Sequence, residues 1–93
     1  MVTLKSRITV PSDVLFRDVG SEAVILSMGT GKYYGLDEVG TRMWALLAEH
    51  RCLEPVYQAL LTEYDVEAGR LEQDLLHLTN ELVDCGLLLL DAS

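Results

Sequence analysis

The spacing of apolar residues changes at Asp37, and this change limits most strongly what the chain can fold into. Before it, residues 14–19 (VLFRDV) and 22–28 (EAVILSM) are rich in β-branched and apolar side chains, as strands are. A Gly-Thr-Gly turn leads into KYYGL (32–36), so the second and third segments are predicted to form a hairpin. The apolar run AVIL (23–26) indicates a middle strand with neighbours on both sides. The first third therefore predicts a three-stranded antiparallel sheet.

From Asp37 onward the apolar period is that of a helix. Asp37 is suited to cap a first helix that runs to about His50, and Pro55 belongs in the first turn of a second helix. A third helix is expected over roughly 67–85, with Gly86 in the position of a left-handed cap. It carries one stripe of four leucines, Leu71, Leu75, Leu78 and Leu82. Burial of all four would favour a purely structural role for that stripe.

The order of elements, three strands and then three helices, predicts an α+β fold that is winged helix-turn-helix-like, with its sheet at the N-terminal end. The apolar tail LLLLDAS (87–93) is expected to return to the core or to pair briefly with a strand. A chain of 93 residues without a linker or repeat is expected to form one domain, residues 1–93.

The charge of the chain is −8, and it is unevenly distributed. Residues 1–36 carry four basic and three acidic side chains, whereas residues 37–93 carry three arginines and twelve acids. The third helix alone has five acids against Arg70, so it would be repelled by a phosphate backbone. These charges disfavour nucleic acid as a partner. The absence of a long apolar run disfavours a membrane span or a signal peptide, and a cytoplasmic location is expected.

No motif for catalysis or for a cofactor meets its required context in this chain. GTGK (29–32) precedes a predicted strand, whereas a phosphate-binding loop precedes a helix. Cys52 and Cys85, taken with His50 and His77, lack the close pairing typical of zinc ligands. We therefore expect no enzyme activity, no cofactor and no metal site.

A small sheet in a helical domain leaves at least one strand edge with unpaired N–H and C=O groups. If KYYGL (32–36) is that edge, an extended peptide can join it as a further strand. Tyr33 and Tyr34 then point to opposite faces, so one is expected to pack on the core and the other to line a groove. The alternative is that both tyrosines are ordinary strand residues.

The stretch KYYGLDEVGTRMWALL (32–47) resembles the central signature of the PqqD-like family. That signature is an aromatic strand, Leu-Asp, a glycine and a helix with a Met-Trp pair. EPVYQALLTEYDV (54–66) and the pattern around Asp74 that ends in Gly86-Leu87 are also similar to family members. The resemblance covers about residues 14–90.

The resemblance implies a non-catalytic domain that binds the leader segment of a ribosomally made precursor peptide. In such a domain the leader adds antiparallel to the third strand, in the cleft against the third helix. The residues to which this role is carried over are Lys32, Tyr33, Tyr34, Gly35 and Leu36 on the strand and Leu71, Asp74, Leu75 and Leu78 on the helix. An inner strand residue, Val24 or Leu26, is expected to complete the pocket. Glu72 and Asp74 are expected to meet basic leader residues.

A chain of this size resembles the leader-binding protein of a lasso-peptide cluster. This resemblance implies a leader-cleaving cysteine peptidase and, downstream, a cyclase as partners. Two alternatives stay open. One is a PqqD-type chaperone for a radical-SAM enzyme in pyrroloquinoline quinone biosynthesis, and the other is a winged-helix DNA-binding or adaptor domain.

Overall fold

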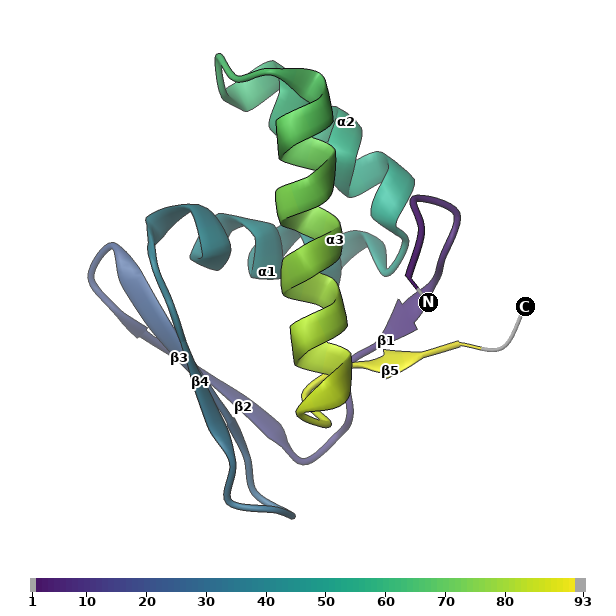
Figure 1. The fold of residues 1–93 in the computed structure, drawn as a ribbon. Helices are drawn as coiled ribbons and strands as arrows, with labels where there is room; N and C mark the ends of the chain where they lie inside the picture. The colour runs from purple at the N-terminus through teal and green to yellow at the C-terminus, as the bar shows by residue number, and fades with distance from the viewer. Residues whose placement is uncertain (1, 92–93) are drawn as a thin grey trace.

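The structure is a computed structural model and describes residues 2–91 of the chain. Three strands and three helices follow one another, flanked by two very short strands (Figure 1). In chain order the elements are β1 (Ile8–Thr9), β2 (Val14–Val19), β3 (Glu22–Ser27), β4 (Tyr33–Leu36), α1 (Glu38–His50), α2 (Leu53–Glu63), α3 (Ala68–Asp84) and β5 (Leu89–Leu90). The predicted α+β fold, a winged helix-turn-helix-like arrangement with an N-terminal antiparallel sheet of three strands, is confirmed.

The main sheet has the order β2-β3-β4, so β3 is the middle strand and β4 lies at an edge. Burial alternates along β3: Ala23, Ile25 and Ser27 are buried, whereas Val24 and Leu26 are half-buried. The face that carries the three buried residues is called the inner face here, and the opposite face is called the outer face. Because α1 packs against both β3 and β4, the inner face is the one that the helices cover.

The joint between β4 and α1 explains the local sequence Leu-Asp-x-x-Gly. Leu36 is buried, and the Asp37 side chain accepts a 2.7 Å hydrogen bond from the Gly40 N–H at the start of α1. A Cβ on Gly40 would lie 3.2 Å from the Asp37 carboxylate and 3.3 Å from the Leu36 side chain. The glycine therefore permits the helix to begin close against the end of the strand.

The third helix ends in a Schellman motif. Gly86 has a φ of 76°, the Leu87 N–H donates to the Leu82 carbonyl at 2.9 Å, and the Gly86 N–H donates to the Val83 carbonyl at 3.0 Å. This pattern satisfies carbonyls that the helix would otherwise leave free. The turn directs Leu87 and Leu88 back into the core, where both are fully buried.

Beyond this turn, β5 pairs antiparallel with β1, with Leu90 opposite Ile8. The tail was predicted to return to the core or to pair with a strand, and it does both over the described residues. Strand β1 itself was not predicted, because two residues carry no recognisable periodicity. None of the helices among residues 2–91 has the length and apolar character that a bilayer span requires.

Candidate functional site

The free edge of the sheet is β4, and its backbone alternates in direction. The Ser27 N–H donates to the Lys32 carbonyl at 2.8 Å, which fixes Ser27 and Lys32 as a hydrogen-bonded pair. In an antiparallel ladder such pairs alternate, so Tyr34 and Leu36 direct their backbone groups toward β3. Tyr33 and Gly35 direct theirs toward the open side, where no strand among residues 2–91 pairs with them. The edge therefore offers two N–H and two C=O groups to a guest strand.

The two tyrosines lie on different faces, as their alternation predicted. Tyr34 stands opposite Ile25 and is half-buried on the inner face. Tyr33 stands opposite Leu26 on the outer face, where 73% of its surface is exposed. One tyrosine was predicted to pack on the core and the other to line a groove, but the core and the groove both lie on the inner side of the sheet. Only the Tyr34 side chain lies on that side and can contact the core and the groove.

Tyr34 also forms the tie between the strand edge and α3. Its hydroxyl donates to Glu81, and it is the one side-chain hydrogen bond that joins β4 to α3 among residues 2–91. The other oxygen of the Glu81 carboxylate lies 3.1 Å from Nε2 of His77, one turn earlier on the helix. The hydrogen bond to Glu81, followed by burial and the nearby negative charge, raises the pKa of Tyr34 to about 12.

This pKa predicts how stability changes at high pH. The folded state favours the neutral Tyr34 hydroxyl, whose pKa is raised from 10.0 to about 12. This contribution to the free energy of unfolding is fully present below pH 10 and is lost as pH rises toward 12. We expect the free energy of unfolding of the wild type to fall toward that of Tyr34→Phe across this window. Urea denaturation of both proteins at a series of pH values measures the difference. A constant difference across the window would contradict the assignment.

Between β4 and α3 the surface is hollowed, and we call this hollow the strand–helix cleft. Its volume is about 470 Å³, and Tyr34, Leu36 and Gly35 of β4 face Asp74 and Leu78 of α3 across it. Val39 and Met43 of α1 also line it. A peptide paired with β4 would therefore have half of its side chains directed into an existing depression.

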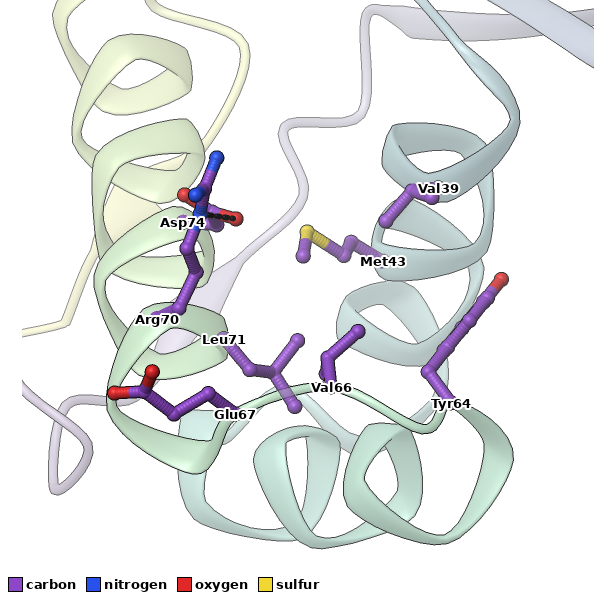
Figure 2. A pocket seen from close by; sticks show the side chains of 8 residues that line it. All are labelled: Val39, Met43, Tyr64, Val66, Glu67, Arg70, Leu71 and Asp74. Carbon is purple, nitrogen blue, oxygen red and sulfur yellow. Dashed lines mark ion pairs between the residues drawn. The ribbon is translucent and has the colours of Figure 1, made fainter.

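A second depression, which we call the helix hollow, continues from the cleft and also has a volume of about 470 Å³. The two share Val39, Met43 and Asp74, so they form one continuous surface. Figure 2 shows Met43 of α1 and Leu71 of α3 extending toward each other across the helix hollow, above Val66 of the α2–α3 connection. Val39 and Val66 remain 40% and 48% exposed, so apolar surface is accessible along the whole path.

The rim of the helix hollow is charged. Glu67 is the N-cap residue of α3, and Arg70 and Asp74 lie on the helix, where they form the ion pair drawn in Figure 2. The Arg70 guanidinium lies 3.8 Å from the Asp74 carboxylate. Both side chains of this pair are largely exposed, so the pair contributes little to stability. An acidic rim around an apolar floor suits a guest that has apolar anchors and basic neighbours.

The structure distributes the predicted site residues over several places. Leu71, Asp74 and Leu78 border the two hollows, as do Tyr34, Gly35 and Leu36. Lys32 is exposed just before β4, and Glu72 lines neither hollow.

The four leucines of α3 are all buried. Burial of the whole stripe favours a structural role, and Leu75, with 0% of its surface exposed, belongs to the core. Leu71 and Leu78 belong to the core too, but each has an edge on a hollow.

One predicted placement is wrong. Val24 or Leu26 was expected to complete the pocket beside the leucines of α3, but both residues lie on the outer face of the sheet, opposite Gly35 and Tyr33. The inner residues of β3 are Ala23, Ile25 and Ser27. A run of four apolar residues gives no phase for the alternation, so the sequence did not indicate which pair faced the helices.

Several lining residues were missed. Val39 and Met43 of α1 and Tyr64 and Val66 of the α2–α3 connection had no sequence signal that placed them at a site. No three His, Cys, Asp or Glu side chains within residues 2–91 lie close enough to hold a metal ion. Cys52 and Cys85 are half-buried free thiols.

An open strand edge beside an apolar cleft on a winged-helix scaffold defines a class of domain that is built to take up an extended peptide. Comparison with family models matches residues 22–88 to Coenzyme PQQ synthesis protein D (PqqD). The chain therefore belongs to the PqqD family. A search of curated proteins gives no match.

Two solved structures are similar over nearly the whole chain. TbiB1, solved in complex with the TbiA(beta) leader peptide, is 34% identical, with a TM-score of 0.83 over 91% of this chain and 99% of that one. A lasso peptide synthetase B1 complexed with the leader peptide is 23% identical, with a TM-score of 0.78 over 89% and 98%. The second likeness supports the fold alone.

Proposed function

We propose that this protein is a non-catalytic domain that captures the leader segment of a ribosomal precursor peptide in lasso-peptide biosynthesis. The leader joins β4 as a fourth strand and lays alternate side chains into the strand–helix cleft and the helix hollow. The observation that carries the proposal is the unpaired β4 edge beside this continuous apolar surface. The similarity to TbiB1, solved with a leader peptide, supports it.

The direction of the guest follows from an antiparallel arrangement. A guest antiparallel to β4 begins beside Leu36 and ends beside Tyr33. Its residues before the paired segment therefore reach the helix hollow, between Met43 and Leu71. Aromatic or aliphatic side chains there supply most of the affinity, while Glu67 and Asp74 at the rim accelerate association with basic guests.

The test uses the leader of the precursor peptide encoded beside the gene of this protein, and the TbiA(beta) leader as a second probe. Titration calorimetry should give saturable binding of at least one leader and none of a scrambled peptide of the same composition. We expect the association rate to fall with added salt while most of the affinity remains. Failure of both leaders to bind the folded protein would exclude this function.

The proposal includes a cytoplasmic location and delivery of the bound leader to a separate cysteine peptidase and then a cyclase. If delivery occurs, cleavage of the precursor by such a peptidase should be faster in the presence of this protein. The acceleration should disappear when the leader is replaced by the scrambled sequence.

The family match itself favours a second candidate, because the matching model describes a protein of coenzyme PQQ synthesis. In that case the guest would be the precursor of the quinone, and the partner a radical-SAM enzyme. Competition between the two precursor peptides for the β4 edge distinguishes the candidates, since only the true guest binds tightly.

A further inference from the structure

The outer face of the sheet carries a dent beside the free edge. Arg17, Val24 and Gly35 form one cross-strand row on this face, from β2 through β3 to β4. At the Gly35 end of the row lies a hollow of about 260 Å³, with Val19, Glu22 and Val24 among its walls. Val19, Glu22 and Val24 belong to the outer face, whereas Leu36 and Asp37 also line the strand–helix cleft, so the dent lies where the outer face meets the end of that cleft.

The backbone conformation at position 35 does not require a glycine. Among the glycines of the chain, positive φ values occur at Gly20, Gly31 and Gly86, and Gly35 is not one of them. A Cβ built on Gly35 would meet no heavy atom within 4 Å beyond its chain neighbours. A glycine inside a strand lowers stability because it is flexible and packs nothing. The fold itself would therefore accept a larger residue, and what the glycine provides is the empty space.

A strand paired with β4 brings a side chain to that space. Gly35 directs its N–H and C=O to the open side, so the guest residue opposite it forms a hydrogen-bonded pair with it. Side chains of directly opposed residues lie on the same face of a sheet. The side chain of this guest residue therefore emerges on the outer face, directly beside the dent.

We propose that the dent is a second specificity subsite, which takes an aromatic or large aliphatic side chain of the guest residue opposite Gly35. The inference rests on the proposed function and deepens it, because it assigns the outer face a part in selecting the leader. A flat ring laid across a glycine in a neighbouring strand covers exposed backbone and packs against the next strand. Here the next strand offers Val24, and Val19 stands behind it.

The test is a change that fills the dent. Gly35→Val should raise Tm, since a β-branched residue suits a strand and its Cβ has open space around it, yet it should weaken leader binding about tenfold by occupying the space of the guest ring. Arg17→Val is the matched control, because it places the same side chain in the same row at the opposite edge. It should leave the affinity unchanged.

An alanine scan of the leader identifies the guest residue. At one position of the leader, alanine should weaken binding to the wild-type protein. The leader with this alanine should bind Gly35→Val with the same affinity as it binds the wild type. Unchanged or tighter binding of the natural leader to Gly35→Val would overturn the subsite, as would an equal loss for every peptide in the scan. If the wild type binds no leader, the proposed function fails first, and the subsite fails with it. Failure of the proposed function and failure of the subsite alone can be told apart, because the affinity of the leader for the wild type is measured separately.

Discussion

Tyr33→Pro is expected to lower leader affinity by about 10- to 100-fold, whereas Tyr33→Val should lower it only slightly. The N–H of Tyr33 is directed toward the open side of the β4 edge, and proline has no N–H. The guest carbonyl that would accept from it is then left without a partner in the complex. Both changes remove the same exposed ring, so the comparison isolates the backbone group.

Proline is compatible with this position in the free protein. Tyr33 is the first residue of an edge strand, a place where proline does not break the ladder. Circular dichroism and thermal unfolding should therefore be close to those of the wild type. Calorimetry with the leader then measures the lost bond. Equal affinities for the proline and valine variants would show that the guest does not use this amide.

Much of the fold could be predicted because local signals agree with one another. The change of apolar period at Asp37 gave the boundary between strands and helices, and Asp37 itself caps α1 through the Gly40 N–H. Gly86 predicted the end of α3, which the Schellman bonds to Leu82 and Val83 confirm. Each of these signals depends on residues a few positions apart, which is the range at which sequence patterns are most informative.

The parts that could not be predicted depend on contacts between distant segments. Tyr34 and Glu81 are 47 positions apart, and nothing in either residue type announces their hydrogen bond. The helix hollow combines side chains from α1, the α2–α3 connection and α3, which come together only after packing. Val24 and Ile25 are equally apolar, so the sequence could not show which of them is directed toward the helices. The packing of α1 against the sheet determines this.

The difference between local signals and long-range contacts matters most for α3. Its periodicity predicted an apolar stripe but not whether that stripe packs in the core or contacts a guest. Three leucines of the stripe, Leu71, Leu75 and Leu78, were assigned to the peptide site through a resemblance, yet all four leucines of the stripe are in the core. A helix that forms one wall of a cleft must first hold that wall in place. We therefore expect its contacts with a guest to come from Leu71, Asp74 and Leu78, which border the two hollows.

Leu75→Ala is accordingly expected to lower the free energy of unfolding by about 2–5 kcal/mol, because it leaves a cavity at a fully buried position. For a chain of this size, whose total stability is roughly 5–14 kcal/mol, such a loss is a large fraction. Urea denaturation measures it directly. Leu76→Ala, at the half-buried neighbouring position, is the control and should cost clearly less.

A volume-conserving change separates core packing from guest contact at the same position. Leu75→Met should cost less than about 1.5 kcal/mol, so the variant remains folded. If Leu75 only supports α3, the leader should bind Leu75→Met with wild-type affinity, and the folded fraction of Leu75→Ala should do so too. If Leu75 instead touches the guest, affinity should fall in both variants while Leu76→Ala stays unaffected. The affinity of Leu75→Met, measured by calorimetry, therefore decides whether the centre of the α3 stripe belongs to the core alone or also to the peptide site.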